Sequence, residues 1–84
     1  MLNLIYKLDG DELPSAATVY GVRYDKEQEA VRLYCFNQPD ILVKNVGGAG
    51  YMHILERFNE SKDGTVNINL TLHHATLDAK GGNI

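Results

Sequence analysis

The residues best suited to ligand chemistry precede the segment with the strongest helical pattern, and most of them are glycine: Gly47, Gly48, Ala49 and Gly50. A helix N-terminus offers free backbone N–H groups and a partial positive charge, and glycines let a phosphate approach the backbone closely. Lys44 lies just upstream as a cation, and Tyr51 follows as a surface on which a base could stack. The run lacks the lysine and Ser/Thr of a P-loop and the spacing of a dinucleotide fingerprint. A flexible turn is therefore the favoured interpretation, and a phosphate site is the alternative.

No set of residues has the pattern of a catalytic or metal centre. Cys35 is the single cysteine and lies in an apolar run, which favours a buried, unreactive thiol. By periodicity, His53 falls on the exposed side of a helix, His73 on a solvated strand face and His74 towards the core, so these side chains need not converge. We therefore expect a protein that is not an enzyme and has no metal site and no cofactor.

An aromatic and arginine-rich surface is expected on a hairpin formed by residues 18–24 and 29–36. A four-residue loop, Asp25 to Gln28, would pair Tyr24 with Glu29 and Val22 with Val31. The opposite side of this hairpin would then face solvent, and its candidate protein-binding residues are Val19, Arg23, Arg32, Tyr34 and Phe36. Aromatic and arginine side chains carry much of the binding energy at protein interfaces.

The helical alternative for part of this region stays open. Glu, Gln and Ala favour helix, so Lys26 to Tyr34 could form one, whereas the β-branched and aromatic flanks favour the hairpin.

The remaining segments supply the scaffold that would position these groups. Residues 2–8 and 65–74 alternate between apolar and polar side chains, as half-buried strands do, and residues 41–43 suggest a further short strand. Residues 51–59 place an apolar stripe at helical spacing. The sequence thus predicts an α+β fold in which a small antiparallel sheet of four to five strands, in the order β-β-β-(β)-α-β, packs one face against a single helix.

A single core follows from these periodicities. We expect one domain over residues 1–78, followed by a flexible tail over 79–84. The predicted core residues are Leu2, Leu4, Tyr6, Leu8, Val22, Val31, Leu33, Ile54, Leu55, Phe58, Val66, Ile68, Leu70 and Leu72.

Composition narrows the class of protein further. The chain has 84 residues, of which 44% are hydrophobic, and eight Lys and Arg against eleven Asp and Glu leave a net charge of −3. A net acidic chain argues against general nucleic-acid binding, which relies on phosphate neutralisation by cations. One cysteine, no signal-peptide pattern and no long apolar stretch favour a reducing cytoplasm without membrane contact.

These observations predict a non-catalytic binding protein that associates stoichiometrically with an unidentified partner protein, as an inhibitor or accessory factor. In size, acidity and lack of a catalytic set, the chain resembles accessory proteins of phages and mobile elements. A half-covered sheet with exposed aromatic residues also favours a homo-oligomer. The alternative is a small-molecule binder that holds a phosphate-bearing nucleotide at its glycine-rich loop, between two subunits.

Overall fold

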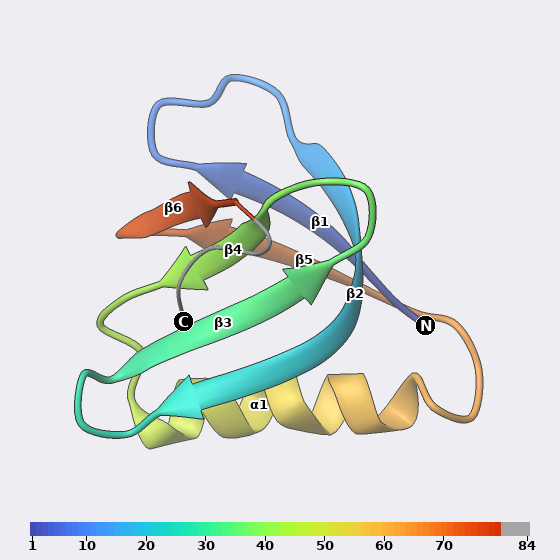
Figure 1. Ribbon diagram of the computed structural model, residues 1–84. Helices are drawn as coiled ribbons and strands as arrows, with labels where there is room; N and C mark the ends of the chain where they lie inside the picture. The colour runs from blue at the N-terminus through green and yellow to red at the C-terminus, as the bar shows by residue number, and fades with distance from the viewer. Residues whose placement is uncertain (80–84) are drawn as a thin grey trace.

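The structure is a computed structural model that describes residues 1–79, and in these residues six strands and one helix form an α+β fold (Figure 1). The elements are β1 (Leu2–Leu8), β2 (Ser15–Asp25), β3 (Ala30–Cys35), β4 (Asp40–Val43), α1 (Gly48–Glu60), β5 (Val66–Leu72) and β6 (Ala75–Asp78). The predicted class, a sheet with one packed helix, is confirmed. The described residues contain six strands rather than four to five, and of the predicted tail over 79–84 only Ala79 lies within them.

The strands form one mixed sheet in the order β5-β1-β2-β3-β4-β6. Neighbouring strands are antiparallel except β1 and β5, which run parallel from the Leu2–Val66 pair to the Leu8–Leu72 pair. The expectation of a wholly antiparallel sheet is therefore wrong. Parallel neighbours need a long connection, and α1 supplies part of it by carrying the chain from β4 to the far edge beside β1 (Figure 1). Alternation within a strand does not reveal the direction of its neighbour.

The strand predicted over residues 65–74 ends at Leu72, and a further strand, β6, follows after two residues. His74 has a positive φ of 55°, which turns the chain sharply, and Ala75 then pairs with Val43 of β4. Strands β5 and β6 are the two edges of the sheet, so this corner joins one edge to the other. The sheet must therefore curl around its core. His74 is exposed at the corner, and the expectation that it faces the core is wrong.

The core occupies the inner side of this curled sheet, against α1. Eight predicted core residues are buried: Leu2, Leu4, Tyr6, Val31, Leu33, Ile54, Ile68 and Leu72. Five more predicted residues pack against them while partly exposed: Leu8, Val22, Phe58, Val66 and Leu70. Leu55 is half-buried. Five residues of the core cluster were not among the predicted core residues: Ala17, Val19, Cys35, Ile41 and Val43.

The hairpin of β2 and β3 is confirmed, and the helical alternative for Lys26 to Tyr34 is wrong. Its register differs from the expected one, because Tyr24 pairs with Val31 and the loop spans residues 26–29. In this loop, the backbone N–H groups of Glu27 and Gln28 donate to the Asp25 carboxylate at 3.0 Å and 3.2 Å. Asp25 is therefore the last residue of β2, where its side chain caps the turn, and not the first residue of the loop.

Candidate functional site

Three aromatic side chains gather on the outer face of β2 and β3, and we call Tyr20, Tyr34 and Phe36 the aromatic cluster. The Tyr20 ring lies 4.5 Å from that of Phe36 and 6.1 Å from that of Tyr34, centroid to centroid. Tyr20 is 46% exposed and Phe36 44%, whereas Tyr34 is half-buried. Together these side chains form a contiguous apolar patch that is exposed to water. Burying such a patch against a binding partner is energetically favourable.

A β-bulge in β2 decides which side chains reach this face. The register slips between Val19 and Gly21, so both Val19 and Val22 point inward, and Tyr20 emerges outside. Val19 is only 1% exposed, so its predicted position on the solvent face is wrong. The simple alternation used for the prediction fails at one residue, because a bulge adds one residue to one strand. Gly21 was the available signal, since a glycine inside a strand often marks a bulge.

Gly21 also makes room for an aromatic ring. A Cβ atom at this position would lie 3.0 Å from Cδ2 of Tyr34, its cross-strand partner. The ring of Tyr34 therefore lies directly over the β2 backbone. On the other side of the cluster, Phe36 is fixed by its backbone N–H, which donates to the Thr18 carbonyl oxygen at 2.9 Å. Both ends of the aromatic cluster are thus held by the sheet.

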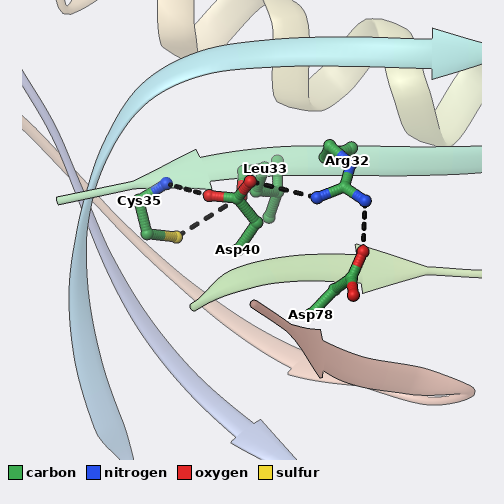
Figure 2. Close-up of polar contacts among 5 residues, drawn as sticks. All are labelled: Arg32, Leu33, Cys35, Asp40 and Asp78. Atoms are coloured by element: carbon green, nitrogen blue, oxygen red, sulfur yellow. Dashed lines mark hydrogen bonds and ion pairs between the residues drawn. The ribbon is translucent and has the colours of Figure 1, made fainter. Parts of the chain in front are cut away.

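The two arginines of the predicted surface are cross-strand partners with different surroundings. Arg23 is exposed. Arg32 extends from β3 towards β4 and pairs with Asp40, at 3.0 Å from Nη1 to Oδ2, and with Asp78 of β6, whose side chain lies over β4 (Figure 2). Hydrogen bonding to Asp78 is the largest effect on the Arg32 pKa, and together with Asp40 it raises that pKa above the usual arginine value.

Asp40 itself is nearly buried, with 3% of its surface exposed. Its other carboxylate oxygen, Oδ1, accepts a hydrogen bond from the Cys35 backbone N–H at 3.0 Å (Figure 2). A buried carboxylate needs such partners to offset its lost hydration. Arg32 therefore ties β3, β4 and β6 together, and Arg23 is the arginine that remains open to a partner.

Helix α1 begins at Gly48, three residues before the predicted start at Tyr51. Gly48, Ala49 and Gly50 therefore form its first turn, and their interpretation as a flexible turn is wrong. Gly47 is the N-cap and makes no side-chain hydrogen bond. Tyr51 is already occupied, because its ring stacks on that of Tyr24 at 4.5 Å between centroids and 7° between planes. The Tyr24 hydroxyl donates to the Val46 carbonyl oxygen at 2.9 Å, which fastens the loop to β2. No side chain would meet a Cβ added at Gly47 or Gly48. A phosphate could therefore still approach the backbone at Gly47 and Gly48, but Tyr51 does not offer a free ring for a nucleotide base.

The exposed Lys44 and all three histidines of residues 1–79 border one depression between α1 and the β5–β6 corner. His53 and His74 line it, and His73 also lies 2.7 Å from an Asp9 carboxylate oxygen through Nδ1. This shared location was not expected from the periodicity. The described residues contain no group of three or more His, Cys, Asp or Glu side chains arranged to hold a metal ion.

Helix α1 is the single helix of residues 1–79 and lacks the length and hydropathy needed to cross a membrane.

Comparisons with protein-family models, with curated proteins and with solved structures returned no match to this chain.

Proposed function

We propose that this protein acts without catalysis, by stoichiometric association with a partner protein through the aromatic cluster and Arg23. The observation that supports this most is the contact between two exposed aromatic side chains, Tyr20 and Phe36, with 46% and 44% of their surface open, on a face of the sheet that no described element covers. Tyr and Arg are enriched among the residues that dominate binding energy at protein interfaces.

The rigidity of the aromatic cluster strengthens the proposal. Gly21 lets Tyr34 lie against the β2 backbone, the hydrogen bond to Thr18 holds the backbone of Phe36, and the Phe36 ring packs against that of Tyr20. Side chains that are already ordered lose little conformational entropy when a partner binds. A second copy of the chain is the other protein that this face could bind, since an isologous interface pairs the same surface on both subunits.

The proposal is tested by removing the two exposed rings. Tyr20→Thr keeps a strand-compatible side chain in β2, and together with Phe36→Thr, in the loop after β3, it removes most of the exposed aromatic surface. We expect this variant to bind the partner at least about 30-fold more weakly, since two lost anchors at roughly 1–2 kcal/mol each sum to at least about 2 kcal/mol. The partner is first captured from lysate of the source cells with the wild type, then purified, and its affinity is measured by calorimetry.

Leu77→Thr is the matched control, because Leu77 is 48% exposed on strand β6. It should leave partner affinity unchanged. Equal affinity of the Tyr20/Phe36 variant and the wild type for the same purified partner would refute the proposal. Arg32 is kept in all variants, because its removal also breaks the ion pairs to Asp40 and Asp78.

Gly21→Ala provides a second test that keeps every aromatic residue. Its new Cβ would lie 3.0 Å from Cδ2 of Tyr34, which is tighter than ordinary van der Waals contact, so the Tyr34 ring would have to shift slightly away from β2. We expect weaker partner binding, with a loss of stability near 1 kcal/mol from overpacking.

Sedimentation of the wild type tests whether the partner is a second copy of the chain. A mass that rises with protein concentration, and that rises less in the Tyr20/Phe36 variant, would identify the partner as the chain itself.

A further inference from the structure

A separate groove on the outer face of β5, β1 and β2 is lined by side-chain amides. Its volume is about 620 Å³, and no charged residue among residues 1–79 lines it. The amide groups come from three parts of the chain and converge on this one surface; they are Asn3, Asn37, Gln38, Asn67 and Asn69. We call this surface the amide groove. It is an unusual lining in a chain of which 23% is charged.

The sheet register explains how these groups are arranged. Asn67, Asn3 and Thr18 are successive partners across β5, β1 and β2, so their side chains form one polar row. Asn3 Nδ2 donates to Asn67 Oδ1 at 3.1 Å, which orients both amides. In the neighbouring row, Ala16 is the small residue at the β2 end. Asn69 and Ile5 are the other members of that row, so the groove contains the apolar Ile5 side chain beside the amides.

The loop after β3 forms the wall of the amide groove. Its backbone is anchored to β2 by the hydrogen bond from Phe36 to Thr18, which brings the exposed Phe36 ring to the end of the polar row. Asn37 has a positive φ of 58°, so the chain turns immediately after this ring. Gln38 is held by a hydrogen bond from its Nε2 to the Tyr6 hydroxyl at 3.2 Å.

We propose that the amide groove binds a neutral saccharide. Each amide side chain offers both a carbonyl acceptor and N–H donors, so a cluster of them can pair with adjacent hydroxyl groups, which are also donors and acceptors. The Phe36 ring at the end of the row offers an apolar face for the C–H groups of a sugar ring. A phosphate, a nucleotide or an acidic peptide would need a cation, and the groove offers none among its lining residues.

This inference goes beyond the proposed protein binding and shares only Phe36 with it. The four asparagines and Gln38 lie outside the aromatic cluster, so variants at these positions separate the two ideas. Failure of saccharide binding would leave the protein-binding proposal standing, and failure of partner binding would leave the groove unaffected.

Nuclear magnetic resonance of the isotope-labelled full chain is the direct experiment, because side-chain NH₂ groups of Asn and Gln give their own signals. The probes are four neutral disaccharides: maltose, cellobiose, lactose and N,N′-diacetylchitobiose. We expect at least one of them to shift the NH₂ signals of Asn3, Asn67 and Asn69 in a saturable way. An anionic arm with a sulfated heparin disaccharide and a short oligo(dT) should give no such shifts.

Asn67→Leu and Asn69→Leu then test the amides themselves. Both residues are exposed on edge strand β5, so the replacements keep side-chain bulk and remove the hydrogen-bonding groups. We expect the double variant to bind the responding disaccharide at least tenfold more weakly. Asn59→Leu, at an exposed position of α1, is the matched control and should bind as the wild type does.

Three results would overturn the inference. The first is the absence of saturable shifts with all four neutral disaccharides. The second is stronger binding of the sulfated disaccharide or of oligo(dT) than of any neutral sugar at the same signals. The third is unchanged disaccharide affinity in the Asn67/Asn69 variant, which would show that the amides are only the solvated outer surface of the sheet.

Discussion

At the scale of single residues, Arg32 illustrates how a side chain suited to an interface can serve the fold instead. Its guanidinium lies between the carboxylates of Asp40 and Asp78, and only 13% of its side chain is exposed. Asp40 is nearly buried, and its carboxylate also accepts a hydrogen bond from the Cys35 backbone N–H. Arginine suits this place because its planar fork can engage two carboxylates at once, whereas lysine presents a point charge.

Arg32→Met should therefore destabilise the protein strongly. Removing one partner of a buried ion pair typically costs about 3–5 kcal/mol, because the remaining charge is left uncompensated. Urea denaturation measures this loss. Arg57→Met is the control: Arg57 pairs with Glu60 at 3.1 Å on the exposed helix surface, where such pairs contribute at most about 1 kcal/mol. Similar losses in the two variants would contradict the structural role of Arg32.

The pH dependence of the Arg32 contribution follows from the direction of its pKa shift. The carboxylates raise the pKa of Arg32, so its stabilisation is complete below the pKa of the unfolded chain and is lost only as pH rises through the higher folded value. That range lies well above neutrality. On the alkaline side, the stability difference between wild type and Arg32→Met should stay constant from about pH 7 to about pH 10.

At the scale of elements, the start of α1 depends on a contact with β2. Tyr24 stacks on Tyr51 and bonds the Val46 carbonyl, so one side chain fixes both the loop and the first turn of the helix. The helix needs this support, because its glycine-containing first turn has low helix propensity, and its N-cap makes no side-chain hydrogen bond.

Tyr24→Phe and Tyr24→Ala separate the two parts of this contact. The phenylalanine variant loses only the hydroxyl bond and should cost about 1 kcal/mol, whereas the alanine variant also loses the stack and should cost about 3 kcal/mol. Hydrogen exchange should show faster opening of the first turn of α1, with β1 amides little changed. Equal protection of that turn in all three proteins would mean that the stack does not hold it.

At the scale of the whole molecule, the curl of the sheet is controlled by the corner between β5 and β6. His73 and His74 are the only residues between an edge strand that pairs with β1 and an edge strand that pairs with β4. The backbone N–H of Lys44 also donates to the His74 carbonyl oxygen at 3.0 Å, which ties the corner to the end of β4. The left-handed conformation of His74 makes this change of direction possible.

Substitution at His74 tests the corner. His74→Gly removes the cost of a positive φ in a residue with a side chain, and we expect a gain of about 1 kcal/mol. His74→Val should destabilise by at least about 1 kcal/mol, because β-branched side chains fit this region poorly. Chemical denaturation measures both variants, with His73→Gly as the neighbouring control. A valine variant as stable as the wild type would show that the corner can form with another backbone conformation.

Local patterns predicted the parts of the fold that depend on neighbours within one segment. The alternation of Leu2 and Leu4 with Asn3 correctly assigned the two faces of β1, and the apolar stripe located α1. The hairpin was also predictable, since charged residues separated two β-favouring segments. Each of these inferences needs only a few consecutive residues, over which side-chain direction follows the backbone geometry.

The candidate site was predictable only in part. Arg23, Tyr34 and Phe36 lie outside the core as expected, whereas Val19 is buried and Tyr20 lies on the outer face because of the bulge. The two carboxylates that hold Arg32 are 8 and 46 residues away in the chain. The amide groove likewise combines β1 with residues of β5 that lie 64 positions later. Nothing in the spacing of these residues indicates that they meet.

By itself, the sequence thus determined the α+β class, most of the core and the side-chain faces of β1 and β5. Only the tertiary structure decided the parallel pairing of β1 with β5, the sixth strand, the bulge at Tyr20 and the partners of Arg32. The physical reason is that apolar burial sets a local period along the chain, whereas the neighbours of a strand depend on the joint packing of all of them.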